Sequence, residues 1–304
     1  MSVDSTHSAH LQELSKKAQQ GTDEFSKWAQ DAALNPEEVY KQITKKLGRL
    51  PVNPPWSIFA KIFHEDTPEN IFQSQADFTD RIFKEYSVNK GSLIVDAACG
   101  TGGFVRLLSM AGYSSVIGFD QSIEMIAEAK KLGPQATDYF VSSIQNLELS
   151  PKADAIIWYD FSSNFALNET QLKELLKSLL KNLKENGVLI FDIRIDNGWE
   201  IDFFKQKVTT FSTENFQRIW INLPNFKTRE IVFDIFIRTK EENGKWAQWE
   251  REQMKEKMWL LNEVRDIVYS LKGIDLIGIY NDQYLPYKEG ESIQLAKFVL
   301  KKVT

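Results

Sequence analysis

The segment Val95–Phe104, which reads VDAACGTGGF, holds one carboxylate and three glycines. Gly100 and Gly102 can adopt backbone angles that a side chain would forbid, and they let the backbone approach a ligand closely. Asp120 ends the next apolar run, where nucleotide-binding sheets carry the acid that hydrogen-bonds ribose hydroxyls. These residues predict a site for a small molecule that contains a ribose, with Gln121 placed to flank its base.

The loop departs from the pattern that binds dinucleotides. That pattern reads Gly-x-Gly-x-x-Gly, and Val105 stands here at the third glycine position. A sulfonium cation has no pyrophosphate to seat at a helix N-terminus, and carboxylates and aromatic faces suit it better. The loop therefore favours a sulfonium ligand over a nicotinamide dinucleotide.

Three segments in order resemble the class I S-adenosylmethionine-dependent methyltransferases: Asp96–Phe104, Gly118–Asp120 and Glu185–Asp192, the last resembling the strand-five motif. The resemblance implies S-adenosyl-L-methionine as cofactor and S-adenosyl-L-homocysteine as product. It implies the methionine end of the cofactor beside the glycine loop and the ribose at Asp120. Many relatives carry Gly-Asp after strand three, where this chain has Ser142-Ser143-Ile144, so we expect Ser143 or a backbone group to contact the adenine. The expected cofactor-binding residues are Asp96, Ala98, Gly100, Gly102, Asp120, Gln121, Ser143, Ile144 and Trp158.

Polar residues follow two further expected strands and are candidates for the methyl-transfer pocket. The reaction is an in-line displacement that mainly requires proximity, alignment and exclusion of water. Tyr159 or Asp160 could orient or deprotonate an amine, and His64 is the one histidine beyond the N-terminal arm that could act as a base. Arg194 could clamp a substrate carboxylate or instead pair with Asp192 or Asp196. The expected catalytic residues are Tyr159, Asp160 and His64; the expected substrate-binding residues are Asn164, Asp192, Arg194 and Trp199.

The order of apolar segments predicts an α/β fold. Strands are expected at 92–96, 115–119, 138–141, 153–159 and 187–193, and they alternate with helices at 100–110, 122–131 and 169–183. This alternation indicates a doubly wound, mostly parallel seven-stranded sheet with helices on both faces, closed by strands at 274–280 and 295–301. The stretches 216–222, 229–239 and 245–259 predict an antiparallel cap inserted after strand five, which resembles the cap of glycine- and sugar-amine-type N-methyltransferases.

The N-terminal arm is expected to be a helical extension. Helices fit residues 8–31 and 36–47, and the prolines of Leu50–Pro55 end the second because proline lacks an amide proton. We therefore expect an extension at 1–55 and a methyltransferase domain at 56–304, with the cap at about 199–260. The arm could be a solvated extension, a lid or an oligomer contact.

Composition narrows the class of protein. The 304 residues carry a formal net charge of -5, one cysteine and three histidines. The acidic balance argues against a nucleic-acid partner, the lack of a long apolar run against a membrane span, and the cysteine and histidine spacing against a bound metal. We expect a cytoplasmic enzyme, with a homo-oligomer formed through the cap or the arm as an option. Its expected reaction is methylation of a small-molecule acceptor, most readily at an amine nitrogen. O-methylation of a small biosynthetic intermediate and a non-catalytic scaffold with a degenerate methyltransferase fold are the alternatives.

Overall fold

The computed structural model describes residues 23–32, 34–67, 72–133, 138–196 and 207–303. The chain divides into two compact units. The larger comprises Phe63–Asn197 and Glu256–Thr304, and the smaller comprises Met1–Ile62 and Gly198–Lys255.

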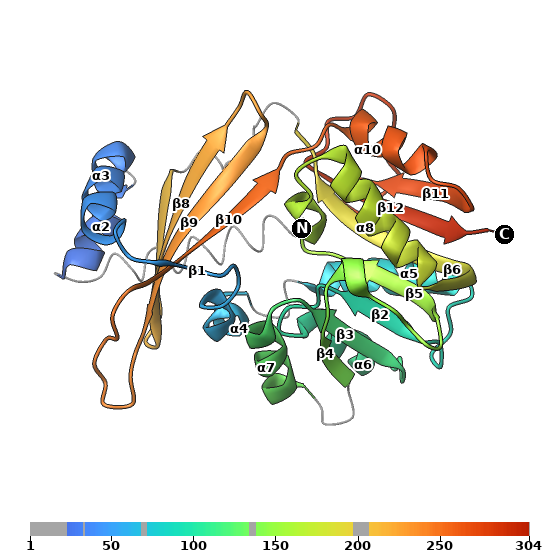
Figure 1. Cartoon of the computed structure of the whole chain (residues 1–304), viewed down its shortest axis with the longest axis horizontal. Helices are drawn as coiled ribbons and strands as arrows, with labels where there is room; N and C mark the ends of the chain where they lie inside the picture. The colour runs from blue at the N-terminus through green and yellow to red at the C-terminus, as the bar shows by residue number, and fades with distance from the viewer. Residues whose placement is uncertain (1–22, 33, 68–71, 134–137, 197–206, 304) are drawn as a thin grey trace. The chain divides into compact units, whose positions relative to one another are not determined.

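The larger unit is built on a seven-stranded sheet with the order β11-β12-β6-β5-β2-β3-β4 (Figure 1). The pairs from β4 through β3, β2 and β5 to β6 are parallel, whereas β12 runs antiparallel to both β6 and β11. The chain therefore has the expected α/β class and a sheet of the expected kind. The strands are β2 Ile94–Ala97, β3 Val116–Asp120, β4 Asp138–Val141, β5 Ala153–Trp158, β6 Leu183–Arg194, β11 Ile274–Tyr280 and β12 Leu295–Lys302.

Helices cover both faces of this sheet. The helices α5 (Gln73–Glu85), α6 (Gly103–Met110) and α7 (Ile123–Leu132) share one apolar core with Val188 and Ile190 of β6. The helices α8 (Glu169–Lys181) and α10 (Leu261–Tyr269) share the other core with Leu189 and Phe191 of the same strand. Because alternate side chains of β6 enter opposite cores, the strand is apolar without interruption from Val188 to Phe191, as a central strand of such a sheet must be. Shorter helical turns lie at α4 (Phe63–Asp66), η3 (Ile144–Asn146) and η4 (Ser162–Phe165).

The smaller unit is a five-stranded sheet with the order β1-β10-β9-β8-β7 and two helices, α2 (Glu24–Ala32) and α3 (Pro36–Leu47). Its core joins apolar side chains of the helices, such as Trp28 and Ile43, to Ile219 and Phe236 of the sheet. The strands are β1 Val52–Asn53, β7 Val208–Ser212, β8 Phe216–Asn225, β9 Glu230–Thr239 and β10 Glu250–Lys257, with a 3-10 turn η1 at Phe59–Lys61.

This unit differs from the expected division of the chain. The arm expected at 1–55 and the cap expected at about 199–260 are not separate, because β1 pairs in parallel with β10 through Val52 and Arg251. Strand β7 was not expected, and β10 begins at Glu250 rather than at 245, since the preceding segment contributes an isolated bridge from Trp246 to Lys240. Pairing between segments about 200 residues apart leaves no local pattern in a sequence. The first part of the helix expected at 8–31 lies outside the described residues.

Candidate cofactor and acceptor site

The glycine loop between β2 and α6 has the backbone angles for which glycine is suited. Gly100 and Gly102 have φ values of 53° and 78°, and Ala98 also has a positive φ of 58°. A Cβ added to Gly102 would lie 2.5 Å from the Tyr139 hydroxyl oxygen, so no larger residue fits there without movement. A Cβ added to Gly100 would meet nothing nearer than Met125 Sδ at 3.9 Å. The loop is thus tightly packed at Gly102 and open at Gly100.

Asp120 ties the glycine loop to the end of β3. Its buried carboxylate accepts hydrogen bonds from the backbone N–H of Gly100 at 3.0 Å and of Ser122 at 2.8 Å. A carboxylate has about four acceptor positions, which leaves capacity for a ribose hydroxyl. The sequence analysis missed Arg106, a buried arginine of α6 whose Nη1 donates to the Thr101 carbonyl at 2.7 Å and holds the loop from beneath. An arginine between apolar residues of a short helix was the signal available.

Negative charge accumulates beside this loop. Burial raises the pKa of Asp96 well above its usual value, and the charges of Asp120 and Asp160 raise it further. Burial also raises the pKa of Asp120, which the backbone N–H groups of Ser122, Gly100 and Gln121 partly offset. The arrangement penalises each carboxylate for the presence of the others, so a bound cation would relieve the repulsion.

The remaining expected cofactor contacts follow β3 and β4 or end β5. Ser143 is half-buried, Ile144 is buried and Gln121 is exposed. Trp158 is buried against Phe191, and its Nε1 has no hydrogen-bond partner among the described residues. Hydroxyl, apolar and indole groups are available here in place of an acid.

The two expected catalytic residues after β5 have different surroundings. Tyr159 is buried, its hydroxyl lies 2.9 Å from Thr79 Oγ1, and its ring meets Phe104 edge-on with centroids 5.3 Å apart. Asp160 is an exposed residue, yet desolvation raises the pKa of its carboxyl, and the charge of Arg194 partly offsets that rise. Tyr159 is therefore engaged within the core, whereas Asp160 reaches the surface beside Arg194.

Asn164 and Asp192 differ from the expected substrate contacts, because both side chains are buried and bind the chain itself. Asn164 Nδ2 donates to the carbonyls of Arg194 at 3.3 Å and Lys257 at 2.6 Å, and its Oδ1 accepts from the Arg194 N–H at 2.9 Å. Asp192 accepts from the N–H of Phe161 at 2.9 Å and of Asp160 at 3.2 Å. Their amide and carboxylate groups shape the loop after β5.

Arg194 pairs with a residue that the sequence did not indicate. Its Nη1 lies 3.0 Å from Glu256 Oε2, and its guanidinium carbon lies 3.7 Å from the centre of the Phe161 ring. Glu256 was not among the expected partners, because it is distant in sequence and meets β6 only through the tertiary fold. With Glu256 on one side and an aromatic face on the other, Arg194 is poorly placed to clamp a substrate carboxylate.

His64 lies exposed on α4, and none of its contacts joins it to Asp160 or Tyr159 among the described residues. Trp199, the last expected substrate contact, lies outside the described residues. Within the described ranges no helix is long and apolar enough to cross a membrane, and no group of three or more acidic, histidine or cysteine side chains is placed to hold a metal.

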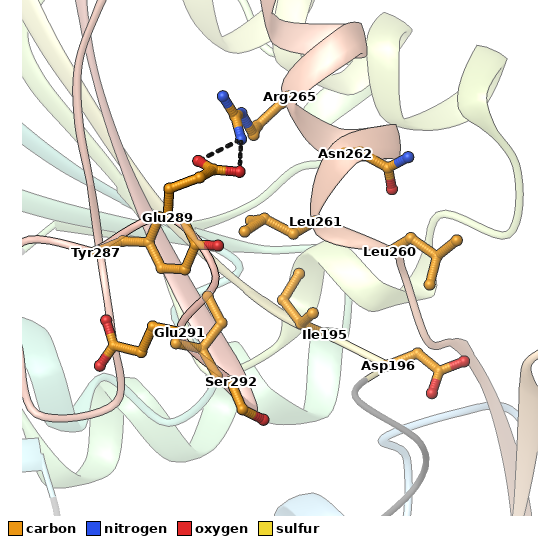
Figure 2. A pocket seen from close by; sticks show the side chains of 11 residues that line it. Ile195, Asp196, Leu260, Leu261, Asn262, Arg265, Tyr287, Glu289, Glu291 and Ser292 are labelled. Carbon is orange, nitrogen blue, oxygen red and sulfur yellow. Dashed lines mark hydrogen bonds and ion pairs between the residues drawn. The ribbon is translucent and has the colours of Figure 1, made fainter.

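A pocket of about 300 Å³ lies beside the end of β6 (Figure 2). Ile195 and Asp196 form one wall, the start of α10 a second and the segment from Tyr287 to Ile293 a third. Figure 2 shows Arg265 turned toward Glu289, with Nη1 and Oε2 3.1 Å apart. The volume is at the lower end of the range for small-molecule sites.

Comparison with known proteins agrees with this sheet and loop. Residues 94–187 match the family described as "Methyltransferase domain". Residues 94–187 therefore resemble a methyltransferase domain, and the chain has the fold of solved S-adenosylmethionine-dependent methyltransferases.

Individual relatives support the same class. A protein of Geobacillus sp. (strain WCH70), named a methyltransferase by inference, is 29% identical over 62% of this chain and 76% of its own length. A solved S-adenosylmethionine-dependent methyltransferase from Clostridium acetobutylicum ATCC 824 is 18% identical, with a TM-score of 0.63 over 81% of this chain and 97% of that one. The sugar N-methyltransferase KedS8 from Streptoalloteichus sp. ATCC 53650 is 16% identical, with a TM-score of 0.63 over 84% of this chain and 95% of that one.

Proposed function

We propose that this protein transfers a methyl group from S-adenosyl-L-methionine to a small-molecule acceptor, at an amine nitrogen. The main support is the group of three carboxylates at the carboxyl ends of β2, β3 and β5, those of Asp96, Asp120 and Asp160. Their mutual repulsion favours binding of a cationic donor. The structurally similar enzymes named above, an S-adenosylmethionine-dependent methyltransferase and a sugar N-methyltransferase, support both donor and acceptor class.

The residues of the loop fit this donor. The open space at Gly100 admits the methionine portion, and Asp120 keeps free acceptor positions for the ribose hydroxyls. When bound, S-adenosylmethionine supplies an activated methyl group whose departure leaves a neutral thioether. The task of the protein is to hold the acceptor in line with that methyl and to exclude water.

The acceptor side favours an amine over a carboxylate. Asp160 offers an exposed carboxylate, whereas Arg194, the nearest candidate for an anion clamp, is already paired with Glu256. An amine must lose its proton to attack, and Asp160 is placed to attract the ammonium form and to receive that proton. Among the expected bases we therefore assign this role to Asp160 ahead of Tyr159 and His64.

Calorimetry with S-adenosylmethionine tests the donor assignment. Asp120→Ala removes the acceptor of the Gly100 and Ser122 N–H groups and the expected ribose contact, so we expect affinity to fall at least about tenfold. Asp154→Asn is the matched control, since Asp154 also accepts a backbone N–H, from Leu93 at 2.8 Å, outside the carboxyl ends of the strands. Equal binding by Asp120→Ala and wild type would refute the site.

A panel of amines and phenols, followed by formation of S-adenosylhomocysteine, tests the acceptor class. For an amine, turnover should rise with pH until the free base predominates. Methylation of phenols or carboxylates alone would instead establish the O-methyltransferase alternative. Tight donor binding without turnover of any acceptor would support the scaffold alternative.

A further inference from the structure

The loop that carries Asp160 is held by one buried carboxylate. Asp192 Oδ1 accepts from the Phe161 N–H at 2.9 Å, and its Oδ2 accepts from the Asp160 N–H at 3.2 Å and from Gln75 Nε2 at 3.3 Å. The Ser163 hydroxyl donates to the backbone carbonyl of Asp192. Asp192 thus binds the loop after β5 at two consecutive N–H groups, those of Asp160 and Phe161.

This loop requires such a holder because its backbone is strained. Asp160 and Phe161 have φ values of 58° and 60°, two consecutive residues with side chains in the left-handed region. Each costs on the order of 1–2 kcal/mol relative to ordinary angles and persists only where the surrounding structure imposes it. The carboxylate oxygens of Asp192 supply that constraint and fix the backbone position from which the Asp160 side chain extends.

A buried lysine faces Asp192 from the neighbouring strand. Lys297 stands opposite Asp192 in the β12–β6 register, is fully buried, and donates from Nζ to the Asn281 carbonyl at 2.9 Å. Its Nζ also lies 4.1 Å from the centre of the Tyr284 ring. A lysine is rarely placed inside an apolar strand unless a charge nearby compensates it.

The groups around Asp192 act on it in opposite directions. The pKa of Asp192 is raised to about 7, chiefly by burial and further by the charge of Asp160. The N–H groups of Phe161 and Asp160 and the charge of Lys297 act in the opposite direction and limit this rise. Tyr159 and Tyr284 are the other titratable groups nearby, and burial raises the pKa of Tyr159 well above neutrality. Burial also raises the pKa of Asp160, which the Arg194 charge partly offsets, so the two carboxyls of this cluster titrate together and Asp192 changes charge near neutral pH.

We propose that Asp192 is a positioning residue that holds Asp160 and Phe161 for the acceptor, that Lys297 favours its ionised form, and that protonation of Asp192 loosens the loop. Protonation turns one of the two oxygens into a hydroxyl, which is a poorer acceptor than a carboxylate oxygen, so the hydrogen bond from one of the two N–H groups weakens. The link to the acceptor rests on the proposed function, whereas the link from Asp192 to the loop does not.

Hydrogen exchange of the peptide that covers residues 159–165 tests the inference without an acceptor. Rates are followed by mass spectrometry between about pH 5.5 and 9 and corrected for intrinsic exchange. We expect wild-type protection to rise with a midpoint near pH 7, where Asp192 ionises. Asp192→Asn presents an N–H₂ to one of the two N–H groups, so its loop should exchange at least about tenfold faster throughout.

Lys297→Met supplies the readout that a merely structural role would not move. Without the lysine charge, the midpoint of protection should shift to higher pH while full protection returns in alkali. Asp154 lies near the amino end of β5, away from the carboxyl ends of the strands, so Asp154→Asn should keep the wild-type dependence of protection on pH. Wild-type protection that does not change with pH, or an unchanged midpoint in Lys297→Met, would overturn the proposal.

Two further measurements separate this proposal from others. The peptide over β5 reports general unfolding in Asp192→Asn; if it also exchanges faster, the wild-type and Lys297→Met profiles decide. Calorimetry with S-adenosylmethionine is run on the same samples. If the wild-type protein does not bind S-adenosylmethionine, the proposed function is refuted, whereas the pH dependence of loop protection still tests the role of Asp192.

Discussion

Replacing Gly102 with alanine tests how closely the cofactor loop is packed against the sheet. The added Cβ would lie 2.5 Å from the Tyr139 hydroxyl oxygen and 2.7 Å from two of its ring carbons, at a residue whose φ is 78°. The left-handed backbone costs about 1–2 kcal/mol and overpacking about 1–3 kcal/mol. We therefore expect the free energy of unfolding to fall by about 2–5 kcal/mol.

Two other glycines with positive φ separate these terms. Gly290 has a φ of 84° and nothing within 4 Å of an added Cβ, so Gly290→Ala should show the backbone cost alone, about 1 kcal/mol. Gly100→Ala has a φ of 53° and a nearest atom at 3.9 Å. Its stability should resemble that of Gly290→Ala, while its added methyl enters the space assigned to the donor and weakens binding at least about tenfold.

Urea unfolding followed by tryptophan fluorescence measures stability, and calorimetry with S-adenosylmethionine measures binding. The two compact units can unfold in separate transitions, and all three glycines lie in the larger unit. The three variants are therefore compared by the unfolding transition of the larger unit. The packing argument is wrong if Gly102→Ala is as stable as Gly290→Ala. Unchanged donor affinity in Gly100→Ala would remove Gly100 from the proposed site.

Two further predictions concern charge. Because burial and neighbouring carboxylates raise the pKa of Asp96, Asp96 should become neutral at a higher pH than an ordinary aspartate. The preference for cationic S-adenosylmethionine over neutral S-adenosylhomocysteine, measured as the ratio of their affinities by calorimetry, should therefore decrease as pH falls. An affinity ratio that stays constant with pH, or an Asp96→Asn protein with the wild-type ratio, would contradict this. Arg194 and Glu256 form a largely buried ion pair, so Arg194→Met should destabilise the protein by about 3 kcal/mol because it leaves Glu256 buried without this partner. The double variant Arg194→Met with Glu256→Gln should recover part of that loss. A double-mutant cycle in urea that shows no coupling energy between the two residues would contradict this prediction.

Local patterns were sufficient to predict the larger unit. Its strands and the helices α6, α7 and α8 were placed within a few residues because a doubly wound sheet buries apolar runs such as Val188–Phe191 on both faces. The glycine loop and Asp120 were predicted for the same reason: positive φ and a strand-end acid depend on residue type and short spacing. The smaller unit was predicted less well, since its β1–β10 pairing joins distant segments.

The sequence by itself therefore determined the fold class and the position of the glycine loop, since both depend on interactions between near neighbours. Only the tertiary structure decided which polar residues at the sheet edge are free and which are occupied. Asp160, Asp192 and Arg194 are equally polar in the sequence, yet the fold exposes the first, buries the second under a strained loop and pairs the third with Glu256. Burial and pairing are set by segments brought together from across the chain, so the same charged side chain becomes a ligand group, a holder or an ion-pair partner according to what surrounds it.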